Sequence, residues 1–270
     1  MMTGIGGVML AMVGLLIWPW CLIRLAAWRP AWLAPLSPTL DGWRTSPRPS
    51  LSRLIAAWSL VLTASLLPTA SGWTAADLDA GLIWLVFLAG LGWLVDGRSS
   101  LDHRAAAGAL LSGVGVVLPA VLRAASLNLS DLVIAQQGGA GNWFLVREPF
   151  LLLAGLGYLV RAAAIWEADA AAASDNRDLW STWLGLGRPL VAAHLFTVLF
   201  LGGWWAFVPF LDGLPWFNTL LKTLVSFGLL LAVRRWGWVS PALLRGWLPV
   251  ATLLAALGSL AWLVIGGGVR

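Results

Sequence analysis

Charged residues are scarce in this chain of 270 residues: 17 Lys or Arg and 12 Asp or Glu amount to 11% of it, against 60% hydrophobic residues. A water-soluble domain of this length needs far more charge to cover its surface, so the composition excludes that class. The single cysteine, Cys21, excludes a disulfide framework and a cysteine-bound metal. The two histidines, His103 and His194, are too few for a multi-histidine cage, so we expect no metal site.

The sequence contains long runs of apolar residues. They recur along the whole sequence, and a run of about 18 residues crosses a hydrocarbon core of roughly 30 Å as a helix. An outer-membrane barrel would show short alternating segments instead of continuous runs. The first run, within Met1–Trp20, has no basic segment before it and is interpreted as a retained helix, not a cleaved signal peptide. The sequence therefore predicts an all-α, polytopic membrane protein.

The runs predict a single transmembrane domain, residues 1–270, with about eight spanning helices. A further segment, 35–45, is too short and too polar to span, and we interpret it as a short interfacial helix. Small-residue spacings, such as Gly108 to Gly115 and Gly90 to Gly92, allow two helices to approach closely. The predicted spans are residues 4–27, 51–70, 79–97, 106–127, 148–167, 187–210, 214–235 and 243–267.

The distribution of arginine predicts the orientation. One set of alternate loops carries most of the basic residues, and the opposite set carries mainly aspartates with few basic groups. By the positive-inside rule the first set is cytoplasmic, so we expect a multi-pass membrane protein with both termini facing outward, which is the periplasm if the membrane is the bacterial inner membrane that the resemblance described below implies. The net charge of +5 lies in these short loops and not on a soluble basic face, which argues against nucleic-acid binding. The first set comprises Arg24, Arg29, Arg44, Arg48, Arg53, Arg98, Arg104, Arg161, Arg177, Arg188, Arg234, Arg235 and Arg245.

Five ionisable residues within or beside the apolar runs are candidates for an ion or proton path, because such groups are costly in a membrane. Lys222 lies inside the seventh span, and the alternative is a snorkelling or internally paired lysine. His194 lies in the sixth span, and the alternative is a neutral packing histidine. Glu167 and Asp169, beside Arg161, are candidates for the mouth of a polar path; the alternative is an ordinary charge cluster that pairs internally or with a partner.

The cytoplasmic loops hold candidate residues for docking a peripheral subunit. Asp41 and Arg44 lie in the interfacial segment, where the alternative is local pairing or helix capping. Arg48 follows them in the same loop. Arg177 lies between two aspartates in the loop before the sixth span, and the alternative there is a solvated loop. These four residues are the predicted docking set.

Four blocks of sequence occur in order along the chain: Pro35–Arg44, Ser126–Gln136, Phe200–Trp204 (followed by Trp216 and Lys222) and Arg245–Pro249. Together they resemble the membrane subunit that joins the two arms of respiratory complex I, the bacterial NADH–quinone oxidoreductase, and the related membrane subunits of group 4 hydrogenases. The first block keeps Pro38, Asp41 and Gly42 of the family's Gln-Pro-x-x-Asp-Gly segment. The resemblance covers about residues 20 to 267 and implies the same eight crossings.

The departures from this family concern its ionisable groups. The cytoplasmic loop of Arg-x-Gly-Pro-Asn-Arg type is shortened to Arg29–Ala34, and the acid-rich fifth loop has alanines at 170–173. The intramembrane glutamate of the fourth helix is absent, since that stretch reads Val116-Val117-Leu118-Pro119. In relatives these groups line a quinone chamber and begin a chain of ionisable side chains. We therefore expect a degenerate proton path, with quinone bound poorly or not at all.

The resemblance implies a membrane subunit of a complex I-like or hydrogenase-like assembly, itself non-catalytic. It implies antiporter-like membrane subunits and a cytoplasmic peripheral module as partners. The sequence has no ligand set for a flavin or an iron–sulfur cluster, so we expect the chain to bind no cofactor of its own. One alternative is a structural subunit of a redox-free ion or inorganic-carbon transport complex, which the missing charges favour. A second alternative is an autonomous transporter.

Overall fold

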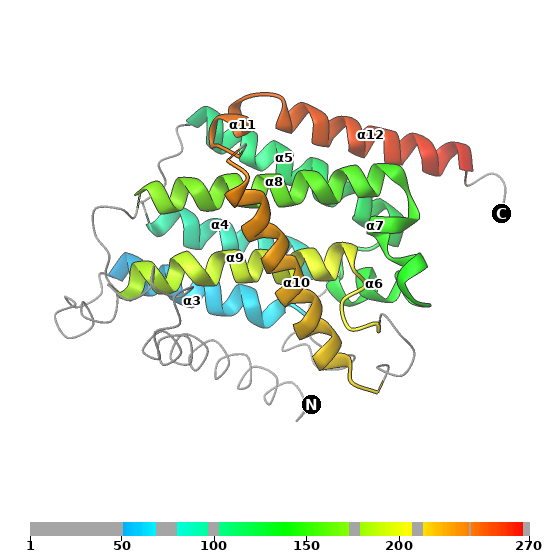
Figure 1. Ribbon diagram of the computed structural model, residues 1–270, viewed down its shortest axis with the longest axis horizontal. Coiled ribbons are helices and arrows are strands. Elements are labelled where there is room, and N and C mark those ends of the chain that lie inside the picture. The colour runs from blue at the N-terminus through cyan, green and yellow to red at the C-terminus, as the bar shows by residue number, and fades with distance from the viewer. Residues whose placement is uncertain are drawn as a thin grey trace.

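The computed structural model describes residues 51–68, 80–96, 103–172, 179–206, 213–237 and 239–266. Within these ranges the regular structure is helical, and Figure 1 shows the helices stacked side by side along one direction, with α10 crossing the others obliquely. The elements are α3 (Leu51–Leu66), α4 (Gly81–Asp96), α5 (His103–Ala124), α6 (Leu129–Ile134), the 3₁₀ turn η2 (Ala140–Asn142), α7 (Phe144–Arg147), α8 (Pro149–Ala172), α9 (Leu179–Phe200), α10 (Pro215–Arg235), α11 (Ala242–Arg245) and α12 (Leu248–Gly266).

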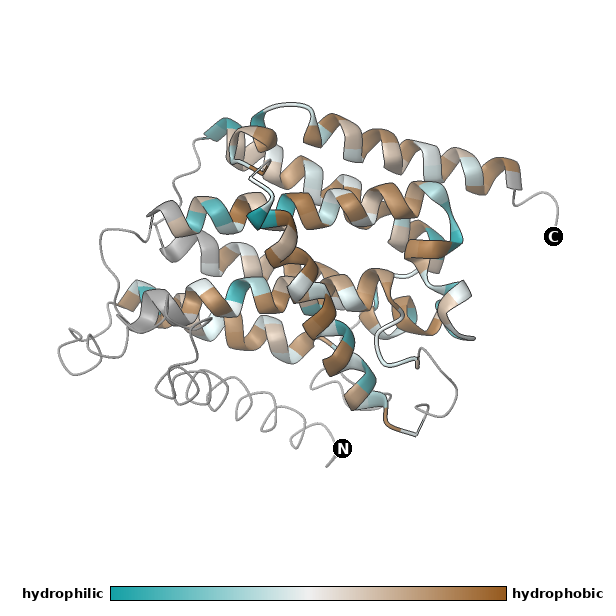
Figure 2. Ribbon diagram, viewed as in Figure 1, coloured by the Kyte–Doolittle hydropathy of each residue, from teal (hydrophilic) through white to brown (hydrophobic). Residues whose placement is uncertain are grey.

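Four of the described helices, α5, α8, α10 and α12, are long and apolar enough to cross a membrane, and α3, α4 and α9 contain shorter apolar stretches. Hydrophobic residues cover most of the length of these helices in Figure 2. Large apolar side chains remain exposed on them, as expected where lipid replaces water. The all-α class is confirmed, and the apolar helices indicate a membrane-embedded protein.

The helix bounds agree with the predicted spans in most places and differ in two. The predicted span 187–210 is wrong at both ends, because α9 runs from Leu179 to Phe200 and contains Pro189. It ends where Gly202 and Gly203 adopt positive φ angles of 69° and 50°. The predicted span 243–267 is interrupted at Gly246, which separates α11 from α12. The predicted span 4–27 and the interfacial segment 35–45 lie outside the described residues.

Glycines bring α5 into backbone contact with α11 and α12 along the top of Figure 1. A side chain at Gly108 would overlap the carbonyl oxygen of Leu244, and a Cβ at Gly115 would lie 2.6 Å from the carbonyl carbon of Thr252. Gly92 of α4 similarly lies against Ser59 of α3, where a Cβ would be 2.8 Å from the hydroxyl. The close approach expected from these glycines is confirmed at Gly108, Gly115 and Gly92.

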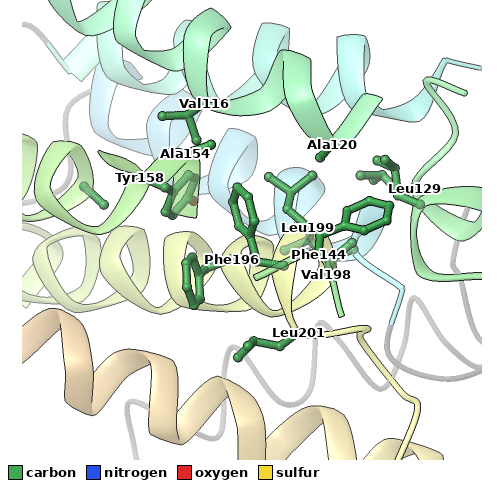
Figure 3. Close-up of a cluster of buried hydrophobic side chains, with 14 of the residues drawn as sticks. Val116, Ala120, Leu129, Phe144, Ala154, Tyr158, Phe196, Val198, Leu199 and Leu201 are labelled. Atoms are coloured by element: carbon green, nitrogen blue, oxygen red, sulfur yellow. The ribbon is translucent and has the colours of Figure 1, made fainter. Parts of the chain in front are cut away.

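An aromatic cluster fills the space between α8 and α9. The ring centroids of Tyr158 and Phe196 are 5.7 Å apart, and those of Phe196 and Phe200 are 5.3 Å apart. Figure 3 shows the rings of Tyr158 and Phe196 among aliphatic side chains from neighbouring elements, including Val116 of α5. The Tyr158 hydroxyl donates to the Ala192 carbonyl at 2.8 Å, so this buried polar group has a partner. This cluster sets the position of the end of α9, where the candidate site lies.

Candidate functional site

The ammonium of Lys222 lies in a site made of main-chain oxygens. Its Nζ donates to the carbonyls of Leu201 at 2.6 Å, Gly203 at 3.1 Å and Trp205 at 2.5 Å. It also lies 4.2 Å from the ring centroid of Trp143, which adds a cation–π contact. The lysine is 8% exposed, and an ammonium has three N–H groups, so each donor has an acceptor. We call these three carbonyls and the Trp143 ring the carbonyl site.

The local fold explains why carbonyl groups gather there. The three carbonyls belong to Leu201, Gly203 and Trp205, which follow Phe200, the last residue of α9. Gly202 and Gly203 have positive φ angles in this turn, and alternate carbonyls, those of residues 201, 203 and 205, are directed toward Lys222 of α10. Lys222 lies one turn beyond the buried Asn218 on α10. Its positive charge is attracted by the partial negative charges of these carbonyl oxygens. The lysine therefore stabilises the break between α9 and α10.

Gln136 holds the same turn from the other side and was not among the predicted site residues. It is fully buried after α6, and its Oε1 accepts from the backbone N–H groups of Phe144 at 3.1 Å and Gly202 at 3.0 Å. Its Nε2 lies 3.0 Å from the carbonyls of Leu132 and Val198. One amide thus joins α6, α7 and the end of α9. A glutamine inside a polar block of sequence gives no signal of such a role.

Replacement of Gln136 by leucine is expected to lower the free energy of unfolding by about 2–3 kcal/mol, because two buried N–H groups and two carbonyls lose their partner. The measurement is thermal unfolding of the purified protein in detergent. Gln137→Leu is the matched control, since Gln137 is the exposed neighbour, and it should unfold close to the wild-type temperature. Equal effects of the two substitutions would contradict the bracing role of Gln136.

Arginines of α10 and α9 pair with the two candidate acids near the end of α8. Arg234 Nε lies 2.6 Å from Glu167 Oε2, and the guanidinium of Arg234 stacks 4.6 Å from the ring centroid of Trp166. Arg188 Nη1 lies 3.1 Å from Asp169 Oδ2. Arg161, the arginine nearest to both acids in the sequence, pairs with neither of them and donates instead to the Ala109 carbonyl of α5. Glu167 is 42% exposed, so its ion pair contributes little stability.

His194 and Arg161 both lie deep within their helices. His194 lies about four turns after Leu179, because α9 starts eight residues before the predicted span 187–210. Its Nε2 is 3.4 Å from the Pro68 carbonyl. Arg161 donates from Nε to the Ala109 carbonyl of α5 at 2.7 Å. These contacts lead to other elements than those of Lys222, so the three residues do not form a connected path within the described part of the chain.

A buried ion pair that the sequence did not indicate joins α5 to the start of α8. Glu148 is 4% exposed, and its Oε1 lies 3.3 Å from Arg123 Nε. In the sequence Glu148 follows Arg147 between two apolar runs, where it looks like an ordinary loop charge. Its burial depends on Arg123, which lies in the last turn of α5, so only the packing of the two helices reveals the pair.

Most cationic side chains of this site and its surroundings are held by oxygen acceptors of the described residues. Lys222, Arg123, Arg188 and Arg234 each contact carbonyl or carboxylate oxygens. Within the described ranges, no group of three or more His, Cys, Asp or Glu side chains is placed to hold a metal ion. The docking residues Asp41, Arg44, Arg48 and Arg177 lie outside the described residues. No protein-family model matches the chain.

Proposed function

We propose that this chain is a structural membrane subunit of a larger energy-converting assembly of the complex I-like or hydrogenase-like kind. It links a cytoplasmic module to antiporter-like membrane subunits and has a degenerate quinone and proton path. The observation that carries the proposal is the Lys222 site, in which an ammonium inside an apolar helix is fully occupied by backbone carbonyls. A lysine held in this way supports the helix packing and does not need to exchange its proton.

The four blocks of similar sequence support the choice of assembly. Three of them contribute to the parts that the structure describes: Ser126–Gln136 forms α6 and places Gln136, Phe200–Trp204 forms the turn of the carbonyl site, and Arg245–Pro249 lies at the break between α11 and α12. The blocks thus fall on turns and contacts that shape the bundle. We propose with them the eight crossings, the inner-membrane location and the outward termini.

The competing proposal is a redox-free ion or inorganic-carbon transport complex that uses the chain as a structural subunit. The valines and alanines at the positions of the family's acids favour it. An autonomous transporter is the third candidate. The broad apolar faces of the described helices fit a subunit with membrane neighbours.

The test is purification of the native complex through a tag on this chain, followed by identification of its co-purifying subunits. Quinone-reductase or hydrogenase large and small subunits would support the first proposal. Antiporter-like subunits without redox subunits would support the second. A stable monomer that transports a solute in liposomes would overturn both. A quinone-site inhibitor is expected to leave the thermal stability of the purified complex unchanged, and clear protection would contradict the lost quinone site.

Charge reversal of Arg44 and Arg48 together is expected to reduce recovery of the cytoplasmic module about tenfold, because complementary charge governs docking at such surfaces. The membrane partners should be recovered unchanged. Reversal of Arg235, exposed at the end of α10, serves as the control. Undiminished recovery of the peripheral subunits from the double variant would remove these two arginines from the docking surface.

A further inference from the structure

Arg161 places a guanidinium near the middle of the bundle. It lies about 18 Å along α8 from Pro149 and about 16 Å from Ala172, at roughly 1.5 Å per residue. Arg161 is also six residues, about 9 Å along the helix, before Glu167, whose ion pair with Arg234 belongs to the polar end of α8. Within the described part of the chain it donates one hydrogen bond, from Nε to the Ala109 carbonyl at 2.7 Å. An arginine has five N–H groups, so most of its donors are left for another partner.

The acids whose side chains the structure describes are paired with residues other than Arg161. Of its 12 acidic residues, the four with described side chains each have a partner of their own: Asp131 with Ser126, Glu148 with Arg123, Glu167 with Arg234 and Asp169 with Arg188. The other eight flank the apolar runs and do not interrupt them: Asp41, Asp77, Asp79, Asp96, Asp102, Asp175, Asp178 and Asp212. A counterion for Arg161 at this depth is therefore not supplied by the described part of the chain.

One face of α5 beside the guanidinium is partly exposed. A Cβ at Gly113 of α5 would lie 3.1 Å from Arg161 Nη2, so the glycine makes space for the side chain. Ala106, Leu110, Gly113 and Val117 follow one another at helical spacing on one face of α5. That face is partly exposed, with Leu110 at 66%, and Arg161 itself is partly exposed. Small residues at positions 106 and 113 permit close approach of another helix.

We infer that Arg161 receives a carboxylate from a transmembrane helix of a partner subunit, which packs against the face of α5 that carries Leu110 and Gly113. The inference rests on the proposed role as a subunit and specifies the chemistry of one membrane partner. An Asp or Glu at the middle of an apolar helix would neutralise the guanidinium by a paired, charge-assisted hydrogen bond. An anionic lipid headgroup offers similar chemistry, and the cross-linking experiment below distinguishes it from a partner helix.

Arg161→Met tests this inference through two measurements with opposite expected signs. Recovery of one membrane subunit with the tagged variant should fall about tenfold or more, because the partner's acid is left without its counterion. The variant chain alone, purified in detergent, should unfold at the same temperature as wild type or higher, because an uncompensated charge has been removed. A merely structural arginine would lower both the recovery and the unfolding temperature.

A photo-cross-linking amino acid at Leu110 identifies the neighbour. The expected adduct contains a membrane subunit with an acid inside an apolar helix, and its yield should drop when Arg161→Met is added. Adducts with lipid alone, or wild-type recovery of every subunit from Arg161→Met, would overturn the inference. A wild-type chain that purifies without any membrane partner would instead overturn the proposed function, so the two failures are distinguishable. Charge exchange between Arg161→Glu and the identified acid, changed to arginine, should restore recovery.

Discussion

Lys222→Met is expected to lower the free energy of unfolding by about 3 kcal/mol, and the unfolding temperature in detergent by roughly 5–10 °C. Methionine matches the length and apolar character of the lysine side chain but donates no hydrogen bond. The carbonyls of Leu201, Gly203 and Trp205 would then lose the donor that they share, and each buried carbonyl without a donor costs free energy. The end of α9 should lose its fixed geometry first.

The same substitution separates the two interpretations of this lysine. If Lys222 carried ions, methionine would abolish transport and leave the assembly intact. The carbonyl site supports the opposite outcome, with loss of thermal stability and of assembly together. Leu221→Met is the matched control, because Leu221 is the neighbouring residue on α10 and is 45% exposed. An unfolding temperature unchanged by Lys222→Met, combined with lost transport, would contradict the structural role.

Gly108→Ala is expected to destabilise the protein by about 3 kcal/mol or to prevent its folding, although it adds a single methyl group. The added Cβ would overlap the carbonyl oxygen of Leu244, which is main chain and has no rotamer to change. α11 and the start of α12 would have to move away from α5, with loss of the packing of Leu248. The measurement is the yield of folded protein and its thermal unfolding in detergent.

Gly228→Ala provides the control, since a Cβ at this position on α10 meets no atom within 4 Å. It should leave stability within about 0.5 kcal/mol of wild type, or raise it slightly, because alanine favours helix. If both substitutions proved harmless, the backbone contact between α5 and α11 would not exist as described. If both were equally damaging, the cause would be a general intolerance of substitution in this protein.

The positions of most helices were predictable from the apolar runs, because a spanning helix needs a long stretch without charge. The end of α9 was not, since glycines are common inside membrane helices and Gly202 and Gly203 lie within the apolar run of the predicted span 187–210. Only their positive φ angles show that the helix stops before them. The break at Gly246 was missed for the same reason. Small residues in a membrane protein indicate either close packing or a turn, and sequence alone does not distinguish them.

The sequence predicted one residue of the candidate site, Lys222, but not the groups that surround it. Lys222 stood out because a lysine within an apolar run is rare and costly. Its partners are main-chain carbonyls, which every residue carries, so no side-chain pattern marks them. The pairing of Arg234 with Glu167 and of Arg188 with Asp169 joins residues of different helices. Sequence proximity favoured Arg161 as their neighbour, and helix packing decided otherwise.

The contacts of Lys222 also bear on how the chain enters the membrane during synthesis. Inside the hydrocarbon core an unaccompanied lysine opposes insertion, by roughly 2.5–3.5 kcal/mol at the centre of a helix and by less toward its ends, and the carbonyls that offset this belong to the turn that follows the preceding helix. α10 is therefore expected to leave the translocation channel together with α9, as a hairpin, and not as a single helix. Ser226 of α10, 3.1 Å from Thr197 of α9, would close the same hairpin one turn further on.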